Sequence, residues 1–259
     1  MGRRWAVILG SSSGFGAAAA RAFAAEGMGI FGAHMDRRGG MPAVEALIEE
    51  LKGHDVPVVF HNGNAADDGQ RETALASLQE SMGEGDTVGV LLHSLAFGTL
   101  RPYFGEGATI GRRHMDMTLD VMAHSLVYWT QDLVSAGLLA DGGRVFAMTS
   151  SGSLAAWPSY GAVSAAKCAL ESHIRQLAVE LAPMGITANA IMAGVTQTPA
   201  LSKIPGSDLI AETALRRNPH GRLTTTDDVA QCLIALSGPG TRWLTGNVLK
   251  VDGGEAISG

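Results

Sequence analysis

The chain contains few cysteines and no long apolar run. Its 259 residues include two cysteines, Cys168 and Cys232, and neither belongs to a CxxC pair. This pattern indicates neither a disulfide framework nor a zinc site. No stretch approaches the ~18 consecutive apolar residues of a membrane-spanning helix. We therefore expect no metal centre and no membrane partner.

Positive charge is also scarce. The chain has 19 lysines and arginines against 25 acidic residues, and its isoelectric point is near 5.7. This balance argues against a nucleic-acid partner or an anionic membrane surface. The opening "MGRRWAVILG" has an apolar run too short for the core of a signal peptide. We interpret this run as the first strand and expect a cytoplasmic protein.

Short apolar runs alternate with longer helical patterns along the chain. The expected strands are 5–9, 28–33, 56–61, 87–93, 143–149, 186–192 and 247–251. The expected helices are 14–26, 42–51, 69–82, 114–137, 159–182 and 226–236. Such alternation predicts right-handed βαβ crossovers. The expected fold is α/β: a single Rossmann-type, doubly wound, seven-stranded parallel sheet with helices on both faces.

No proline-, glycine- or serine-rich linker interrupts this alternation, so we predict one domain over residues 1–259. The stretch 194–222 is expected to be irregular and is too long for a simple connector. Long loops in compact domains often cover or bind ligands. We therefore expect 194–222 to form a lid over a ligand.

A glycine-rich loop lies between the first strand and the first helix, in "ILGSSSGFGAAAARAFAAEG". Gly10 can form the sharp turn, Gly14 lets the backbone approach a diphosphate, and Gly16 permits close packing of helix on strand. The serines can donate hydrogen bonds to phosphate oxygens. The letters alone also fit a tight turn, but their position favours dinucleotide binding. The predicted contacts are Gly10, Ser11, Ser12, Ser13, Gly14, Phe15 and Gly16.

The G-x3-G-x-G spacing resembles the short-chain dehydrogenase/reductase family. The segments "ITANAIMAGVTQTPA" and "NPHGRLTTTDDVAQCLIALSGPGTRWLTGNVLKVDGG" look like the last third of the same family. The resemblance covers essentially the whole chain. It implies a Rossmann fold, a nicotinamide cofactor, and an NAD(P)H-dependent oxidoreductase that transfers a hydride.

Tyr160 and Lys167 lie seven positions apart on one expected helix. That spacing is within ~20° of two full turns, so both side chains share a face about 10 Å apart. The pattern alone fits a buried tyrosine and a solvated lysine equally well. Ordinary family members use Tyr-x3-Lys. In this chain the residue four positions before Lys167, where that motif has its tyrosine, is Val163. Tyr-x6-Lys is similar to the enoyl-acyl carrier protein reductase branch, which implies catalytic roles for Tyr160 and Lys167.

Two further positions bear on this resemblance. "LLHSLAFG" contains His93-Ser94, which looks like the His-Ser pair of enoyl reductases, and Met122 stands where ketoreductases carry a catalytic asparagine. Ser150 departs from the pattern, because well-known enoyl reductases carry a second tyrosine there. A serine at this position can bond a substrate carbonyl, as in ketoreductases. Ser150 is therefore a third predicted catalytic residue.

These residues leave several functions open. The favoured one is reduction of the C=C bond of a 2-enoyl thioester, as in fatty-acid biosynthesis, with hydride added to the β-carbon and Tyr160 stabilising the enolate. Lys167 would hold the nicotinamide ribose and lower the pKa of the tyrosine. The alternative is a short-chain carbonyl (3-ketoacyl) reductase or alcohol dehydrogenase that uses Ser150 and Tyr160. A regulatory module without catalysis would be expected to lack Tyr160 or Lys167.

The segment "GAHMDRRGG" after the second strand bears on the choice of cofactor. An acid here bonds the adenosine 2′-hydroxyl of NADH, whereas arginines pair with the 2′-phosphate of NADPH. The usual acid position is His34; Asp36 comes two residues late, and Arg37 and Arg38 follow it. This order favours NADPH over NADH, although a solvated turn fits as well. The other cofactor contacts that the resemblance implies are Asn64, Ala65, His93, Ser94, Ala96, Lys167, Ala193, Gly194, Thr196 and Thr198.

The expected partners are a small-molecule substrate, in particular an acyl thioester, and further copies of the chain. Helices 114–137 and 159–182 are long, apolar and poor in charge, so they either pack on another subunit or are covered by the chain's own sheet. The resemblance suggests a homotetramer, with a dimer as the alternative.

Thr198 before Pro199 also fits a helix cap. The expected apolar wall of the lid is Leu201, Ile204, Leu209 and Ile210.

Overall fold

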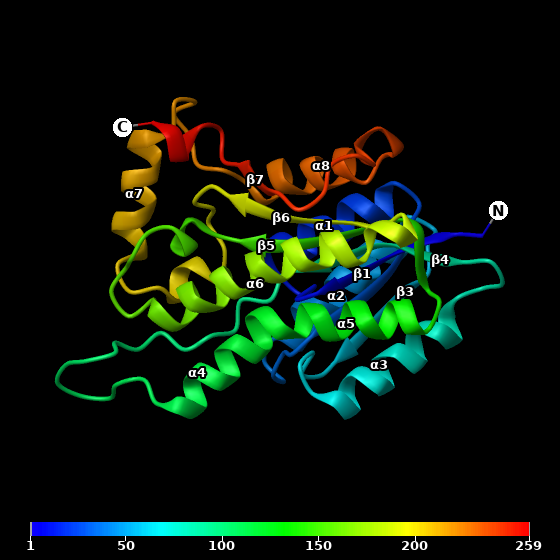
Figure 1. Ribbon diagram of the computed structural model, residues 1–259, viewed down its shortest axis with the longest axis horizontal. Coiled ribbons are helices and arrows are strands. Elements are labelled where there is room, and N and C mark those ends of the chain that lie inside the picture. Colours follow the sequence, from blue (N-terminus) through cyan, green and yellow to red (C-terminus); the bar gives the residue numbers. More distant parts are fainter. Residues whose placement is uncertain (1, 259) are drawn as a thin grey trace.

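The computed structural model describes residues 2–258, and its strands form one sheet in which every neighbouring pair is parallel. The strand order is β3-β2-β1-β4-β5-β6-β7, as Figure 1 shows. The strands are β1 (Arg4–Leu9), β2 (Gly29–His34), β3 (Val58–Asn62), β4 (Thr87–His93), β5 (Leu139–Thr149), β6 (Thr187–Ala193) and β7 (Val248–Val251). The order reverses between β1 and β4, which confirms the predicted doubly wound fold. In open sheets of this kind, ligands bind beyond the carboxyl ends of the strands at this switch point.

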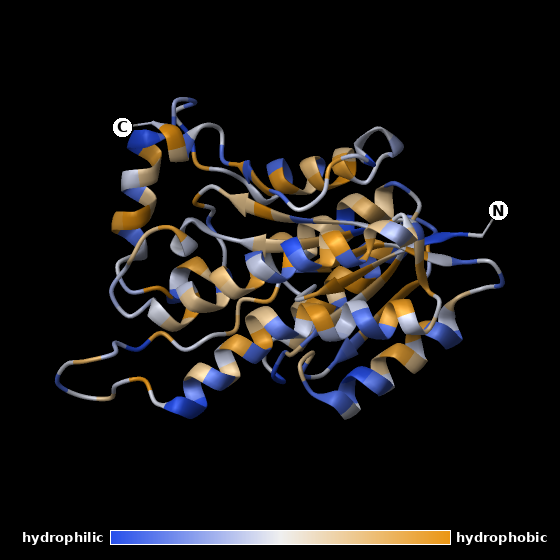
Figure 2. Ribbon diagram, viewed as in Figure 1, coloured by the Kyte–Doolittle hydropathy of each residue, from blue (hydrophilic) through white to orange (hydrophobic). Residues whose placement is uncertain are grey.

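Helices cover both faces of the sheet. They are α1 (Gly14–Ala25), α2 (Met41–Lys52), α3 (Asp68–Ser81), α4 (Arg112–Leu119), α5 (Ser125–Ser135), α6 (Gly161–Glu180), α7 (Ser207–Arg217) and α8 (Thr226–Leu236). In β1, Trp5, Val7 and Leu9 point toward α3, α5 and α6. Ala6 and Ile8 point toward α1, α2 and α8. Because alternate residues of a strand face opposite sides, one apolar strand supplies both cores, and its strand neighbours are equally apolar in Figure 2.

The expected helix 114–137 is interrupted. A π-helix over Asp120–His124 separates α4 from α5. Ser125 follows this wider turn and donates a 2.8 Å hydrogen bond from its hydroxyl to the Val121 carbonyl. The segment contains no glycine or proline that would have indicated an interruption. π-Turns of this kind occur most often beside functional sites.

The expected irregular lid is partly wrong, because it contains the helix α7. This helix begins after Gly206, whose φ of +79° is left-handed, and it has no side-chain cap. Only Ala214 of the helix is buried, so α7 lacks the apolar stripe that indicates a packed helix. Figure 1 shows α7 standing apart from the helices that cover the sheet. No helix within residues 2–258 is long and apolar enough to cross a membrane.

Candidate cofactor and substrate site

The glycine loop has the conformation expected for close approach of a ligand. Gly10 has φ +87° and its N–H donates to the Ala33 carbonyl at 2.8 Å. A Cβ on Gly16 would lie 2.0 Å from the Gly10 carbonyl oxygen, so a side chain there would separate helix α1 from β1. Gly14, at φ +54°, faces Thr198 across the site. The roles predicted for Gly10 and Gly16 in the turn and the packing are confirmed.

The three serines of this loop differ in exposure. Ser11 is fully buried, and both its amide and its hydroxyl donate to the Ala33 carbonyl, at 3.2 and 3.3 Å. This corrects the expectation that its hydroxyl is available to a phosphate. Ser12 is half-buried and Ser13 is exposed at the start of α1. The N–H groups at this helix start face the site, and the positive end of the helix dipole favours an anion there.

His93 ends β4 and is completely buried. Its Nε2 lies 2.9 Å from the Ser125 hydroxyl oxygen, and Ser125 gives its own hydrogen to the Val121 carbonyl. The imidazole therefore donates from Nε2. Burial, together with the nearby charge of Lys167, lowers the pKa of His93 to about 3, so the ring is neutral. The next residue, Ser94, donates its N–H to the Leu9 carbonyl at 2.8 Å, which fixes the end of β4 beside the glycine loop.

Tyr160 and Ser150 come together at the carboxyl end of β5. The two hydroxyl oxygens lie 3.5 Å apart. Burial raises the pKa of Tyr160, and the hydrogen bond with Ser150 opposes that shift. Ser150 also accepts a 3.2 Å hydrogen bond from the Gly152 amide. Tyr160 is the residue that caps α6 at its N-terminus, just outside the helix, whereas the sequence placed it within the first turn.

Lys167 projects from α6 into the interior and is 5% exposed. Its ammonium donates a 2.7 Å hydrogen bond to the Met148 carbonyl of β5. Burial lowers the pKa of Lys167 to about 8, while the charge of Glu171 acts in the opposite direction. Glu171 is held in turn by the Thr149 hydroxyl at 2.6 Å. The structure thus excludes the solvated lysine that the pattern alone allowed.

An apolar cluster fills the space where a ketoreductase carries polar groups. Met122 is 2% exposed and Val163 is 5% exposed, and Tyr160 packs against their cluster. A Cβ on Gly98 would lie 2.7 Å from the Met122 sulfur and 2.9 Å from Val163, so the loop after β4 passes directly over them. Neither side chain can carry a proton. The face of α6 between Tyr160 and Lys167 is therefore part of the core.

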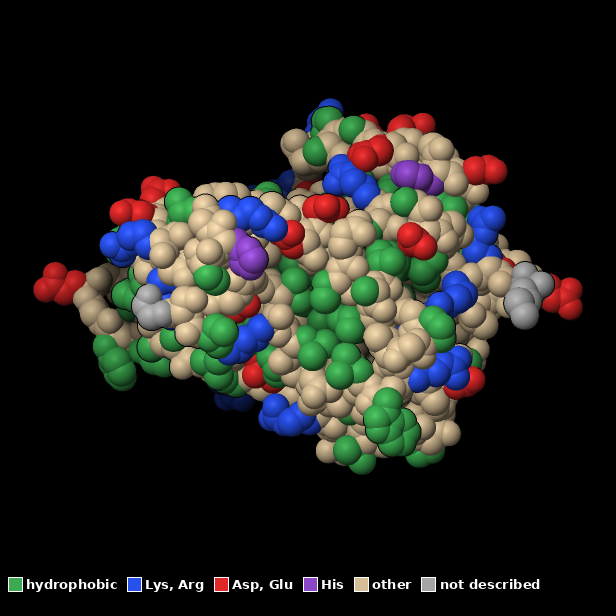
Figure 3. Space-filling view, turned by 90° about the horizontal axis from the view of Figure 1, so that it is seen from above, with side chains coloured by type: hydrophobic (Ala, Val, Ile, Leu, Met, Phe, Trp, Pro, Cys, Tyr) green, Lys and Arg blue, Asp and Glu red, His purple; other side chains and the backbone are tan. Residues whose placement is uncertain are grey.

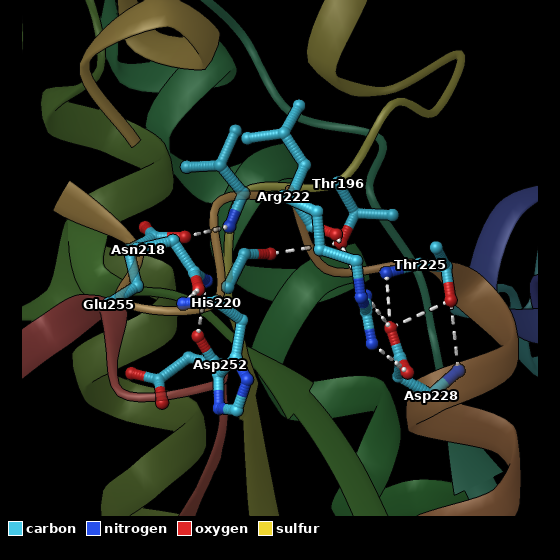
Figure 4. A network of polar contacts seen from close by, with 11 residues as sticks. Thr196, Asn218, His220, Arg222, Thr225, Asp228, Asp252 and Glu255 are labelled. Carbon is cyan, nitrogen blue, oxygen red and sulfur yellow. Dashed lines mark hydrogen bonds and ion pairs between the residues drawn. The ribbon is translucent and has the colours of Figure 1, made fainter. Parts of the chain in front are cut away.

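The loop after β6 is held by a polar network, drawn in Figure 4. Thr196 donates to the Gly194 carbonyl at 3.0 Å, and Glu255 accepts a 3.0 Å hydrogen bond from the amide of the residue between them. Asn218, after α7, donates to the Asp252 carbonyl at 2.9 Å. The network ties the C-terminal end of α7 to the ends of β6 and β7, and it fixes the loop that carries the predicted contacts Ala193, Gly194 and Thr196.

Thr198 is not the N-cap that its sequence allowed, because the turn that follows begins at Leu201 and its N-cap is Ala200. Its hydroxyl accepts a 3.2 Å hydrogen bond from the Leu201 amide, at the start of a short 3₁₀ turn, Leu201–Lys203. The same residue lies next to the glycine loop, because a Cβ on Gly14 would be 3.6 Å from its methyl group. Thr198 thus contacts both the start of this turn and the glycine loop.

Trp157, which the sequence did not single out, is bonded to the segment 194–222 that was expected to form a lid. Its indole Nε1 donates a 3.0 Å hydrogen bond to the Pro205 carbonyl. A second unrecognised aromatic, Tyr103, covers the start of α6, since a Cβ on Gly161 would be 2.5 Å from its ring. Both residues lie in segments that follow the carboxyl ends of strands. This position in the sequence could have indicated them as candidates for the site. Of the expected lid wall, Leu209 is 57% exposed, and Leu201, Ile204 and Ile210 are half-buried.

The far end of the crevice carries the adenosine-side candidates. Arg37 and Arg38 are exposed after β2. Asn64 is exposed, and its side-chain oxygen accepts a 3.1 Å hydrogen bond from the Ala66 amide. The Ala65 carbonyl accepts a 2.9 Å hydrogen bond from the Trp129 indole, which anchors this turn to α5. Figure 3 shows basic and acidic side chains interspersed over the face that carries α7 and α8, with no continuous area of one sign.

Comparison with known proteins agrees with this geometry. A family model described as enoyl-(acyl carrier protein) reductase matches residues 10–255. An enoyl-[acyl-carrier-protein] reductase [NADH] of Aquifex aeolicus (strain VF5) is 32% identical over 70% of this chain and 66% of the relative. A 1-cyclohexenylcarbonyl-CoA reductase of Streptomyces collinus is 34% identical over 57% of this chain and 53% of the relative. These sequence matches thus span less than two thirds of each relative.

The structural match is more complete. The crystal structure of the Aquifex aeolicus VF5 enoyl-[acyl-carrier-protein] reductase (NADH) superposes with a TM-score of 0.84 at 28% identity. The superposition covers 100% of this chain and 98% of that one. The likeness therefore extends over the whole sheet and its flanking helices.

Proposed function

Because the chain belongs to the enoyl-(acyl carrier protein) reductase family of short-chain dehydrogenases/reductases, we propose that it reduces the C=C bond of a 2-enoyl thioester with NAD(P)H. The observation that supports this choice is the face of α6 between Tyr160 and Lys167, where Val163 and Met122 form an apolar cluster. By the resemblance, ordinary ketoreductases of this family carry a tyrosine at the position of Val163 and an asparagine at the position of Met122. Neither is present.

Each polar group then has a defined task. When bound, the nicotinamide supplies a hydride to the β-carbon, which moves negative charge to the thioester oxygen. Tyr160 donates a hydrogen bond to that oxygen, and a preorganised donor of this kind is worth about 3–4 kcal/mol of barrier. Lys167, whose charge is held inside the protein, favours the same oxyanion and binds the ribose hydroxyls of the cofactor. Water or Tyr160 delivers the proton to the α-carbon.

A cofactor of this type fits the residues present. Gly14, at φ +54°, would let the backbone approach a diphosphate, and the neighbouring Ser12 and Ser13 could donate hydrogen bonds to it. We propose NADPH as the preferred form, since exposed Arg37 and Arg38 can pair with a 2′-phosphate. We also propose that residues 1–259 act as one domain in which 194–222, including α7, forms the lid over the acyl chain.

A second function, carbonyl reduction, is favoured by one observation. Ser150 Oγ lies 3.5 Å from the Tyr160 hydroxyl, so both can address one carbonyl oxygen. The experiment that separates the two functions offers purified protein crotonyl-CoA and acetoacetyl-CoA in parallel and follows the loss of absorbance of NADPH or NADH. Oxidation with crotonyl-CoA alone supports enoyl reduction. Turnover of acetoacetyl-CoA alone overturns it and makes Ser150 central.

The homotetramer stays a prediction from the resemblance. Sedimentation velocity of the purified chain tests it directly, because a monomer, dimer and tetramer of 26.8 kDa subunits are well separated. A monomer would contradict both the tetramer and its dimer alternative.

A further inference from the structure

The acidic residue after β2, Asp36, is bonded to the histidine that ends this strand. The Asp36 carboxylate oxygen Oδ2 lies 3.0 Å from His34 Nδ1. The His34 side chain is 2% exposed and that of Asp36 is 29% exposed. A carboxylate only accepts hydrogen bonds, so His34 donates from Nδ1. The ring that occupies the usual acid position therefore holds the acid that follows it.

Two further contacts fix the backbone of Asp36. Its amide donates to the side-chain oxygen of Asn62 at 3.1 Å, and the Asn62 amide group donates to the Asp36 carbonyl at 3.0 Å. Asn62 ends the neighbouring strand β3, and it lies opposite His34 in the register of the sheet. The turn after β2 is thus held from two strands, which leaves the carboxylate little freedom to swing outward.

The other carboxylate oxygen of Asp36 lies at the start of α2. A Cβ on Gly40 would be 2.8 Å from Asp36 Oδ1, so Gly40 is the residue that makes room for it. Gly40 is also the N-cap of α2. The positive end of a helix dipole stabilises a carboxylate in this place. The Asp36 carboxylate is therefore bonded to His34 through one oxygen and lies against the start of α2 with the other.

The neighbouring cations have no such partner. Arg37 and Arg38 are exposed, and neither forms an ion pair with any acid in the part of the chain that the structure describes, residues 2–258. A free carboxylate beside them would compete for a 2′-hydroxyl and repel a 2′-phosphate. With the carboxylate bonded to His34, the two exposed guanidinium groups would meet a 2′-phosphate without that competition.

We propose that His34 determines the choice between the two nicotinamide dinucleotides by holding the Asp36 carboxylate away from the adenosine ribose. The proposal rests on the proposed function in one respect, since it requires a dinucleotide in the crevice. Loss of the His34 donor frees the carboxylate to bond a 2′-hydroxyl and to oppose a 2′-phosphate. His34 thus acts through Asp36 and makes no contact with the cofactor itself.

The test measures binding without turnover. Dissociation constants for NADP⁺ and NAD⁺ are determined by isothermal titration calorimetry for the wild type, His34→Leu, Asp36→Asn and the double variant. In His34→Leu we expect the ratio of the NAD⁺ to the NADP⁺ dissociation constant to fall by about tenfold. A change of this size corresponds to the loss or gain of about one hydrogen bond to a charged group. In the double variant no carboxylate remains to be freed, so the preference returns to the wild-type value.

Controls separate this effect from damage to the fold. His34→Asn keeps a side-chain donor and is expected to preserve the wild-type preference, and His61→Leu removes a histidine from β3 that is not bonded to Asp36. An unchanged preference in His34→Leu, or an equal shift in the double variant, overturns the role of His34. Failure of the wild type to bind either dinucleotide would overturn the cofactor site itself. This result is distinct from binding with an unchanged ratio of the two dissociation constants.

Discussion

The Lys167 ammonium on α6 donates a 2.7 Å hydrogen bond to the Met148 carbonyl on β5. Ser150 lies two residues beyond Met148, at the end of the same strand. The bond therefore braces α6, which begins directly after Tyr160, against the strand that ends directly before Ser150. This brace explains how a chain with a largely exposed loop between residues 150 and 160 keeps the two hydroxyl oxygens 3.5 Å apart.

The first prediction concerns the two hydroxyls. Tyr160→Phe removes the donor to the thioester oxygen and should lower kcat by roughly 10²–10³-fold. Ser150→Ala should lower kcat less than tenfold, because the enolate oxygen has its donor in Tyr160. Steady-state rates with crotonyl-CoA measure both. NADP⁺ binding by calorimetry is the control, and it should not change in either variant. Equal losses in the two variants would contradict this division and show that Ser150 stabilises the enolate oxygen as much as Tyr160 does.

The fold was predictable because its main signals are local. Each strand is a short apolar run, and β1 alone supplies both cores through alternate residues, with Val7 on one face and Ile8 on the other. The glycine loop was predictable because turn geometry and close packing limit Gly10 and Gly16 to glycine. These constraints act within a few residues, so they can be read from the letters.

The details of the site depend on contacts between distant segments. The sequence predicted that Asp36 belongs to the adenosine end, but it did not predict that His34 and Asn62 hold it. Ser11 was expected to face a phosphate, whereas its hydroxyl bonds the neighbouring strand β2. The tether between Trp157 and Pro205 joins residues 48 positions apart. No local pattern specifies such pairs.

The second prediction concerns Lys167, whose pKa burial lowers from 10.5 to about 8. Between these values the unfolded chain binds the proton and the native protein does not, so stability rises with pH across this window. The slope is about 1.4 kcal/mol per pH unit. Lys167→Met should lack this rise in urea denaturation. Over the same range the wild type loses its internal ammonium, so its kcat/KM should fall as pH rises through about 8.

The two pH profiles of Lys167 therefore run in opposite directions. A global loss of structure at alkaline pH would make stability and activity fall together, and the predicted combination excludes that explanation. A wild-type stability curve parallel to that of Lys167→Met would contradict the lowered pKa.

The third prediction concerns the tether of the lid. Trp157→Ala removes the hydrogen bond to Pro205, and an average hydrogen bond contributes about 1 kcal/mol. The lid should then close less often, which raises KM about five- to tenfold with a smaller effect on kcat. Trp243→Ala is the matched control, because Trp243 is 99% exposed and follows α8, away from the lid. Comparable KM values for the two variants would exclude the tether as a determinant of substrate binding.

The fourth prediction concerns His93, whose pKa is lowered from 6.5 to about 3 by burial and by the charge of Lys167. Between these values the unfolded chain binds a proton that the native imidazole does not, so stability is lost as pH falls from 6.5. His93→Gln keeps a donor for Ser125 and cannot ionise. Relative to this variant, the wild type should lose about 1.4 kcal/mol per pH unit in urea denaturation between pH 6 and pH 4. Parallel curves for the two proteins would show that the buried ring does protonate in the native state. In that case His93 could serve as a proton donor near Lys167, a role that its neutral form excludes.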